Sequence, residues 1–270
     1  MADPPSREEV IRRTVVYRMP GMEGVRIRRD VEWRVTDSGP LVLDLYLPRE
    51  SAPAARIPAV IFVSGYPDPG FQTMLGCRFK DVGQYVSWGQ LVAASGLAAI
   101  TYSNREPKDV HALVQHVREN AAALGIDGNR LGIFGCSGNG PTALSVLMSG
   151  ASPAVKCAVL CYALTLDSGA STVVADAAKA FGFANACEGK SIDDLPPSLP
   201  LFVARAGRDE LPRLNESLDR FVAQALTRNL PLTLVNHAEG PHSFDSVDDS
   251  ETSREIVRHI LAFLGRHLSV

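Results

Sequence analysis

The chain has 270 residues and a mass of 29.0 kDa, a size that α/β folds commonly devote to one domain. Hydrophobic residues make up 46% of the chain and charged residues 21%, so the composition excludes a disordered tail, a collagen and a coiled coil. The 27 basic and 30 acidic side chains leave a formal charge of -3 without a basic cluster. This balance argues against a nucleic-acid partner, because a phosphate backbone needs a basic surface.

The apolar runs and the cysteines indicate the cellular compartment of the protein. No stretch reaches the roughly 18 apolar residues that span a bilayer, and the N-terminal residues lack the apolar centre of a signal peptide. Five cysteines, an odd number, lie in largely apolar segments: Cys77, Cys136, Cys157, Cys161 and Cys187. Cys157 and Cys161 flank an apolar run and are expected in the core of a strand, not as metal ligands. We therefore expect a soluble, cytoplasmic protein with reduced thiols and no metal.

Residues 1–57 differ in pattern from the rest of the chain. Apolar and charged residues alternate in Val25-Arg26-Ile27-Arg28, and a similar alternation precedes Pro48. Such alternation is typical of half-exposed antiparallel strands, so we expect this region to form edge strands of a larger sheet.

From Pro58 the chain alternates between two kinds of segment. Short apolar runs, typical of strands buried on both faces, lie at 59–63, 97–102, 131–134, 155–160, 201–204 and 232–235. Apolar residues at helical spacing lie between or after them, at 85–92, 110–124, 214–225 and 256–264. This alternation predicts a mostly parallel sheet in a single α/β domain over residues 1–270.

Residues 164–200 interrupt the alternation after the sixth predicted strand. The segment is rich in Ala, Gly and Ser and ends in Pro196-Pro197-Ser198-Leu199-Pro200. We expect a small lid-like insertion over the carboxyl edge of the sheet, where α/β proteins bind ligands. Its Phe181 and Phe183 are the residues we expect to line a modest apolar substrate pocket.

A tight turn after the predicted strand that ends at Phe134 has the sequence Gly135-Cys136-Ser137-Gly138-Asn139-Gly140-Pro141 and leads into a predicted helix. Strand, turn and helix form the context of a nucleophile elbow, in which small residues flank a strained nucleophile. Ser137 has Gly135 two positions before it and Asn139 two positions after it. Asn139 replaces the usual glycine, and we expect it to be tolerated because asparagine accepts a positive φ.

Two other interpretations of this turn stay open. Cys136 is a rival nucleophile, although that register places Phe134 two positions upstream, where an elbow has little room. A glycine-rich phosphate loop is the other, but no lysine follows the turn and the glycines do not form Gly-x-Gly-x-x-Gly.

A serine nucleophile needs a base to take its proton and an acid to orient that base. In proteins with a nucleophile elbow the acid and then the histidine follow the serine, each on a loop after a later strand. Asp209 follows the run at 201–204, and His242 follows the run at 232–235. The predicted catalytic residues are therefore Ser137, Asp209 and His242.

Other acids and histidines stay open as alternatives. Glu210 is adjacent to Asp209, and Asp167 lies after the preceding strand, where some hydrolases of this architecture keep the acid. His237 lies nearer to its strand and is expected to have a structural role. Four further histidines fall on polar faces of predicted helices: His111, His116, His259 and His267.

Two backbone donors are expected to face the oxyanion of the reaction. Gly138, directly after Ser137, supplies the first. The second is expected from the loop 63–70, where Tyr66 is our first choice and Gly65 the second, because Pro67 has no N–H.

These motifs, Val-Ser-Gly-Tyr at 63–66, Gly-Cys-Ser-Gly-Asn-Gly at 135–140, Ala-Gly-Arg-Asp at 206–209 and Gly-Pro-His-Ser-Phe-Asp at 240–245, resemble those of the α/β-hydrolase superfamily. Within it, the chain from Pro58 onward resembles dienelactone-hydrolase-like and prolyl-oligopeptidase-like esterases. The resemblance implies the α/β-hydrolase fold, with about eight mostly parallel strands and helices on both faces. It also implies hydrolysis of an ester, thioester, lactone or amide through an acyl-enzyme, without a cofactor.

Departures from the family narrow the expected substrate. Dienelactone hydrolases use a cysteine where this chain has Ser137, and prolyl oligopeptidases have an additional propeller domain. A carboxylic ester with a short or medium acyl chain is therefore the expected small-molecule substrate. A lactone, peptide or thioester substrate stays open, as do a ligand-binding protein without turnover and a homodimer.

Overall fold

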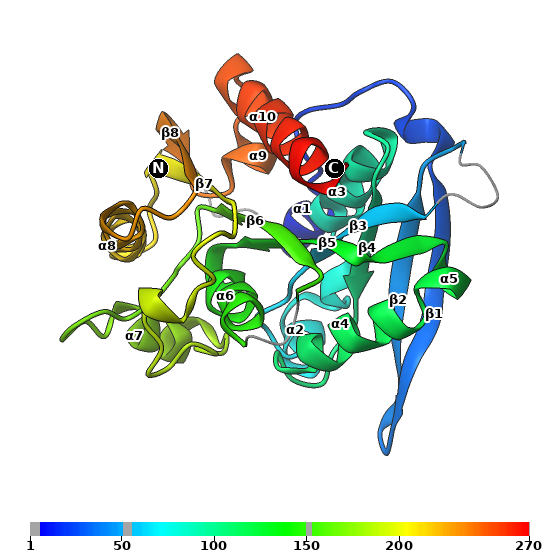
Figure 1. Ribbon diagram of the computed structural model, residues 1–270, viewed down its shortest axis with the longest axis horizontal. Coiled ribbons are helices and arrows are strands. Elements are labelled where there is room, and N and C mark those ends of the chain that lie inside the picture. Colours follow the sequence, from blue (N-terminus) through cyan, green and yellow to red (C-terminus); the bar gives the residue numbers. More distant parts are fainter. Residues whose placement is uncertain (1–5, 51–55, 150–152, 270) are drawn as a thin grey trace.

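The computed structural model describes residues 6–50, 56–149 and 153–269 (Figure 1). Its eight-stranded sheet has the order β1-β2-β4-β3-β5-β6-β7-β8, antiparallel from β1 to β4 and parallel from β4 to β8. The strands are β1 (Arg26–Thr36), β2 (Gly39–Leu47), β3 (Ile57–Phe62), β4 (Ala98–Tyr102), β5 (Ile126–Cys136), β6 (Val155–Cys161), β7 (Leu201–Arg208) and β8 (Leu232–Pro241). The predicted mostly parallel sheet of about eight strands is confirmed.

The N-terminal strands form an antiparallel hairpin, with Val31 opposite Leu43. β1 is largely exposed and forms the edge of the sheet. β2 lies inside the sheet, since it also pairs with β4 through Leu43 and Tyr102. The buried apolar residues of 43–47 explain why β2 needs a neighbour on both sides.

Helices cover both faces of the sheet (Figure 1). One face packs against α3 (Gly83–Ala94) and α10 (Glu251–Leu268). The other packs against α4 (Asp109–Glu119), α5 (Ala121–Leu124), α6 (Gly140–Met148) and α8 (Leu214–Thr227). In β3 the alternation of the pleat sends Ile61 to the second face and Phe62 to the first. No helix within the described ranges is long and apolar enough to cross a bilayer.

Several short helices were not predicted from the sequence. They are α1 (Arg7–Arg12), α2 (Asp68–Leu75), α7 (Val173–Phe181) and α9 (Phe244–Val247), with single 3-10 turns at Met22–Gly24, Phe79–Asp81, Ser137–Asn139 and Ile192–Asp194. Pro69 lies in the first turn of α2, and Gly76 ends the helix with a φ of 80°. The segment 164–200 lies between β6 and β7 and contains α7.

Candidate active site

Ser137 lies at the sharp turn between β5 and α6 and has a φ of 52°, rare for a residue with a side chain. A Cβ atom at Gly135 would lie 2.6 Å from the Cβ of Ala143, so position 135 has room only for glycine. The strained turn and the close packing are the features of a nucleophile elbow.

The three predicted catalytic residues form one hydrogen-bonded chain. Ser137 Oγ lies 2.9 Å from His242 Nε2, and His242 Nδ1 lies 2.7 Å from Asp209 Oδ2. Asp209 comes from the end of β7 and its side chain is fully buried, while His242 follows β8 and stays 23% exposed. A carboxylate at Nδ1 leaves Nε2 free to accept a proton from the serine. The arrangement can therefore activate Ser137 as a nucleophile.

The side chains of the alternative acids, Glu210 and Asp167, and of the alternative base, His237, face solvent or have other partners. Glu210 is exposed, and the carboxylate of Asp167 accepts the backbone N–H groups of Val174 and Ala175 at the start of α7. His237 lies inside β8, which extends to Pro241 and is longer than predicted. Its Nε2 lies 2.9 Å from Asp248 Oδ2 and 3.0 Å from Ser253 Oγ, so it is a buried histidine whose partners lie in and before α10.

Cys136 is a poor nucleophile in this environment. The thiol is buried, and its sulfur lies 3.0 Å from the hydroxyl of Tyr85. Burial raises the pKa of Cys136 to about 11, although hydrogen bonds from Tyr85 and Asn139 oppose the rise. The thiol therefore stays protonated at neutral pH.

A buried carboxylate that sequence reasoning missed lies three residues after His242. Asp245 accepts hydrogen bonds from Tyr162 Oη (2.7 Å), Trp88 Nε1 (2.7 Å) and Gln84 Nε2 (2.9 Å), and burial raises its pKa. The ring of Tyr162 packs edge-on against His242, and its carbonyl accepts the Ser137 N–H at 3.2 Å. The cluster thus supports the elbow and the histidine loop together.

Asn139 has a different role from the one predicted. Its φ is -82°, so it does not use the tolerance for positive φ that the sequence suggested; the positive φ belongs to Ser137. The Asn139 side chain is buried and its Oδ1 accepts the Gly65 N–H at 2.7 Å. This bond also contradicts Gly65 as an oxyanion donor, because its only N–H is already engaged.

Gly138 and Tyr66 are the remaining predicted oxyanion donors. The N–H of Gly138 lies at the start of a helical turn, where backbone donors have no acceptor within the helix. Tyr66 covers this turn, since a Cβ atom at Gly138 would lie 2.7 Å from the Tyr66 hydroxyl. Burial raises the pKa of Tyr66 to about 12, so the hydroxyl keeps its proton and can donate it.

An apolar cavity of about 340 Å³ opens onto Ser137 and His242. Its apolar wall comes mainly from α1, α2 and the segment 79–82 before α3: Val10, Phe71, Met74, Leu75, Phe79 and Val82. This corrects the prediction that residues 164–200 line the pocket. Phe181 does line it, but Phe183 is buried behind Tyr66, with 5.9 Å between the ring centroids.

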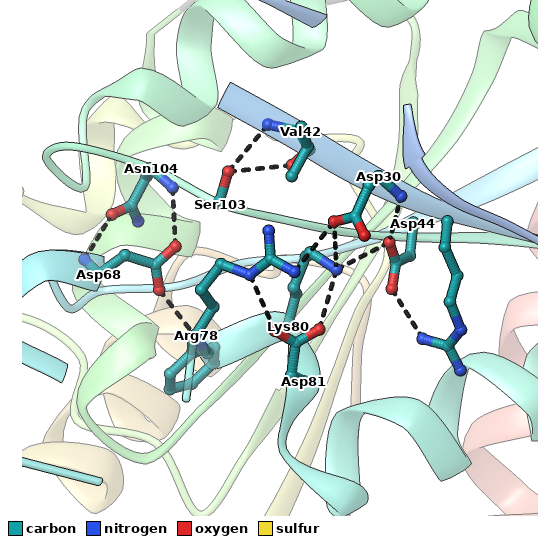
Figure 2. Close-up of polar contacts among 11 residues, drawn as sticks. Asp30, Val42, Asp44, Asp68, Arg78, Lys80, Asp81, Ser103 and Asn104 are labelled. Atoms are coloured by element: carbon teal, nitrogen blue, oxygen red, sulfur yellow. Dashed lines mark hydrogen bonds and ion pairs between the residues drawn. The ribbon is translucent and has the colours of Figure 1, made fainter. Parts of the chain in front are cut away.

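Two buried polar anchors hold the wall segment 68–82 (Figure 2). At its start, the carboxylate of Asp68 accepts the backbone N–H groups of Phe79 (2.9 Å) and Asn104 (3.1 Å). Near its end, the ammonium of Lys80 contacts Asp44 (2.8 Å), Asp81 (2.9 Å) and Asp30 (3.2 Å).

The Lys80 cluster ties the pocket wall to the N-terminal hairpin. Lys80 is 1% exposed and Asp44, on β2, is fully buried. Burial lowers the pKa of Lys80, but hydrogen bonds to Asp44 and Asp81 outweigh it, so the pKa is raised overall. Because Lys80 follows Phe79 directly, the ion pair also fixes an aromatic residue of the cavity.

We expect Lys80→Met to destabilise the protein by about 3 kcal/mol, because it leaves a buried carboxylate without its closest cation. The midpoint of urea unfolding, measured at pH 7, should fall with an unchanged m-value. Lys108→Met is the matched control, since Lys108 pairs with Glu106 on the surface, and its midpoint should not move. Equal midpoints for the two variants would contradict a stabilising role for the Lys80 cluster.

The strand order, the helices on both faces and the elbow at Ser137 define the α/β-hydrolase fold. No protein-family model matches the sequence, and a search of curated proteins finds no match. Within the described ranges no group of three His, Cys, Asp or Glu side chains could hold a metal ion.

Solved structures with this fold resemble the chain at low sequence identity. It is similar to a thermostable esterase from Pseudomonas putida, with 16% identity, 92% of this chain and 85% of that chain covered, and a TM-score of 0.67. It is also similar to esterase Est22, with 17% identity, 89% and 80% covered and a TM-score of 0.67. A third similar structure is Thermogutta terrifontis esterase 2 phosphoramylated by tabun, with 18% identity, 91% and 97% covered and a TM-score of 0.64.

Proposed function

We propose that the protein is a serine hydrolase that cleaves carboxylic esters through an acyl-enzyme on Ser137. The observation that carries the proposal is the unbroken chain from Ser137 through His242 to Asp209 at the mouth of an apolar cavity. The three structures compared above are described as esterases, which supports the same reaction.

In the first half of the reaction, Ser137 Oγ attacks the acyl carbon while His242 Nε2 takes the hydroxyl proton. Asp209 stabilises the imidazolium that forms. His242 then gives the proton to the leaving alcohol oxygen as the ester C–O bond breaks, which leaves the acyl group on Ser137. In the second half, water loses a proton to His242 and attacks the acyl carbon, and Ser137 leaves with that proton.

During the attack, negative charge develops on the carbonyl oxygen of the substrate. We place this oxygen beside the turn 137–139, which the Tyr66 side chain covers. The Gly138 N–H is one donor, and Tyr66 supplies the other through its hydroxyl or its N–H. Among the residues that the structure describes, the Tyr66 N–H makes only a long contact of 3.4 Å to Ser64 Oγ, in contrast to the 2.7 Å bond of the Gly65 N–H. Such donors strengthen as charge develops, so they lower the barrier more than they tighten substrate binding.

The cavity favours a short or medium acyl chain. Its volume of about 340 Å³ is at the small end for a ligand pocket, and its wall contains Phe71, Phe79 and Phe181. A carboxylic ester is preferred over a dienelactone because the nucleophile position holds Ser137. A cytoplasmic setting also belongs to the proposal, supported by five free cysteines.

We expect the protein to hydrolyse p-nitrophenyl acetate and butyrate, with kcat/KM rising from acid pH to a plateau near pH 8. Imidazoles ordinarily titrate near pH 6.5 and must be neutral to act as a base, so acidification removes activity. Initial rates between pH 5 and 10 would measure this profile. EDTA should leave the rates unchanged.

A different profile would contradict the serine mechanism. If Cys136 were the nucleophile, the rate would keep rising above pH 9, because the pKa of its thiol is raised to about 11. Rates that need added divalent metal would instead indicate a metal-activated water.

A further inference from the structure

The side chain of Asn139 joins the turn that carries Ser137 to the loop after β3. The Gly65 N–H is a donor, so the Asn139 atom 2.7 Å from it is the carbonyl Oδ1. Asn139 Nδ2 consequently faces the other way and donates to the Tyr85 hydroxyl on α3 at 2.7 Å. Both contacts are buried, so water does not compete for them.

Gly65 needs such an external support. A Cβ atom at position 65 would lie 2.6 Å from the carbonyl oxygen of Gly138, so the loop can approach the turn this closely only with glycine. Glycine, however, restricts its own backbone less than any other residue. The amide of Asn139 supplies the restraint that the missing side chain cannot.

The next peptide, which carries the Tyr66 N–H, is held by a different partner. The carbonyl of Gly65 accepts the Ala184 N–H at 2.9 Å, and in a trans peptide the next N–H points away from that carbonyl. The Tyr66 carbonyl is held by Asn104 Nδ2 at 3.1 Å. Asn139 fixes the preceding peptide through the Gly65 N–H, so the loop 64–66 is restrained on both sides of Gly65. Within the described ranges, the Tyr66 N–H itself makes only a long contact, 3.4 Å to Ser64 Oγ.

We propose that Asn139 is a positioning residue that holds the loop 64–66 in place for oxyanion stabilisation. This inference rests on the proposed hydrolase function of the site. An oxyanion donor is effective only when its position is held to within about 0.5 Å. Because the carbonyl oxygen gains charge only in the transition state, loosening the loop lowers kcat and leaves KM nearly unchanged.

The test compares Asn139→Ala with Asn139→Asp. The alanine variant loses the hydrogen bonds to the Gly65 N–H and the Tyr85 hydroxyl, together with the longer contact to Cys136 Sγ. We expect its kcat for p-nitrophenyl butyrate to fall about 10- to 100-fold, with KM within twofold of the wild type. The aspartate variant keeps an acceptor for the Gly65 N–H and should recover most of the rate. Thr142→Val is the matched control, since Thr142 is buried in the same turn and helix and its hydroxyl has no partner among the described residues.

A trifluoromethyl ketone separates positioning from general destabilisation, because it adds to a serine as a tetrahedral oxyanion. Its inhibition constant should rise in Asn139→Ala by the factor by which kcat/KM falls, and should stay unchanged in Thr142→Val. If Asn139→Ala does not fold by circular dichroism, Asn139→Ser replaces it, since a serine hydroxyl is too short to reach the Gly65 N–H.

The experiment distinguishes a failure of the proposed function from a failure of the role of Asn139. A wild type that neither hydrolyses esters nor binds the ketone would overturn the proposed function and the inference with it. An active wild type beside an Asn139→Ala or Asn139→Ser variant with unchanged kcat and ketone affinity would overturn only the role of Asn139.

Discussion

Replacing Ser137 by alanine is expected to lower kcat for p-nitrophenyl acetate by about 10⁴-fold or more. The variant keeps the fold but has no Oγ to attack the acyl carbon, and neither His242 nor Asp209 can take over that step. A fluorophosphonate should add one covalent label to the wild type and none to Ser137→Ala. Intact-protein mass spectrometry and initial rates measure the two effects.

Cys136→Ala is the matched control for this prediction, because it removes the adjacent nucleophilic atom. With a thiol pKa of about 11, roughly one Cys136 in a thousand is a thiolate at pH 8. The fluorophosphonate should therefore label Cys136→Ala as it labels the wild type. Labelling that survives in Ser137→Ala and disappears in Cys136→Ala would assign the nucleophile to Cys136 instead.

The sheet and the residues that meet at its edge were predictable from the sequence because parallel strands end on the same side. Strands β5, β7 and β8 lie near one another, so residues just after them come together. Ser137, Asp209 and His242 follow these three strands in turn. An apolar run followed by a polar residue is a local pattern. In this fold it was enough to predict a contact between residues that are far apart in the chain.

The pocket wall was not predictable in the same way. α1 and α2 are short helices, for which apolar periodicity is a weak signal. The position of the wall depends on contacts between segments distant in the sequence, such as Lys80 with Asp44 on β2. Residues 164–200 supply Phe181 to the cavity and use Ala184 to hold the loop after β3.

Asn139 illustrates why a residue in a recognised motif can be assigned the wrong role. The sequence shows a departure from Gly-x-Ser-x-Gly, and backbone tolerance is the explanation available from residue type alone. The function of its amide depends on Gly65, which the fold brings within 2.7 Å. A buried asparagine beside a nucleophile is a signal that a partner must exist, but the sequence does not name that partner.

Replacing His242 by alanine is expected to lower kcat about as much as replacing Ser137, whereas His237→Ala should keep most of the activity. Of the two histidines, it is His242 that lies within hydrogen-bond distance of Ser137 Oγ, at 2.9 Å. The Nε2 of His237 is instead hydrogen-bonded to Asp248 and Ser253. Rates with p-nitrophenyl acetate at pH 8 measure the difference.

The two variants should also differ in thermal stability. His237→Ala, the more active variant, should be the less stable one. His237 is 4% exposed, and its removal leaves a cavity and takes a hydrogen-bond partner from Asp248, so the melting temperature of His237→Ala should fall by several degrees. His242 is partly exposed, and its loss should change the melting temperature less. An active His242→Ala beside an inactive but folded His237→Ala would transfer the role of the base to β8 and contradict the proposed mechanism.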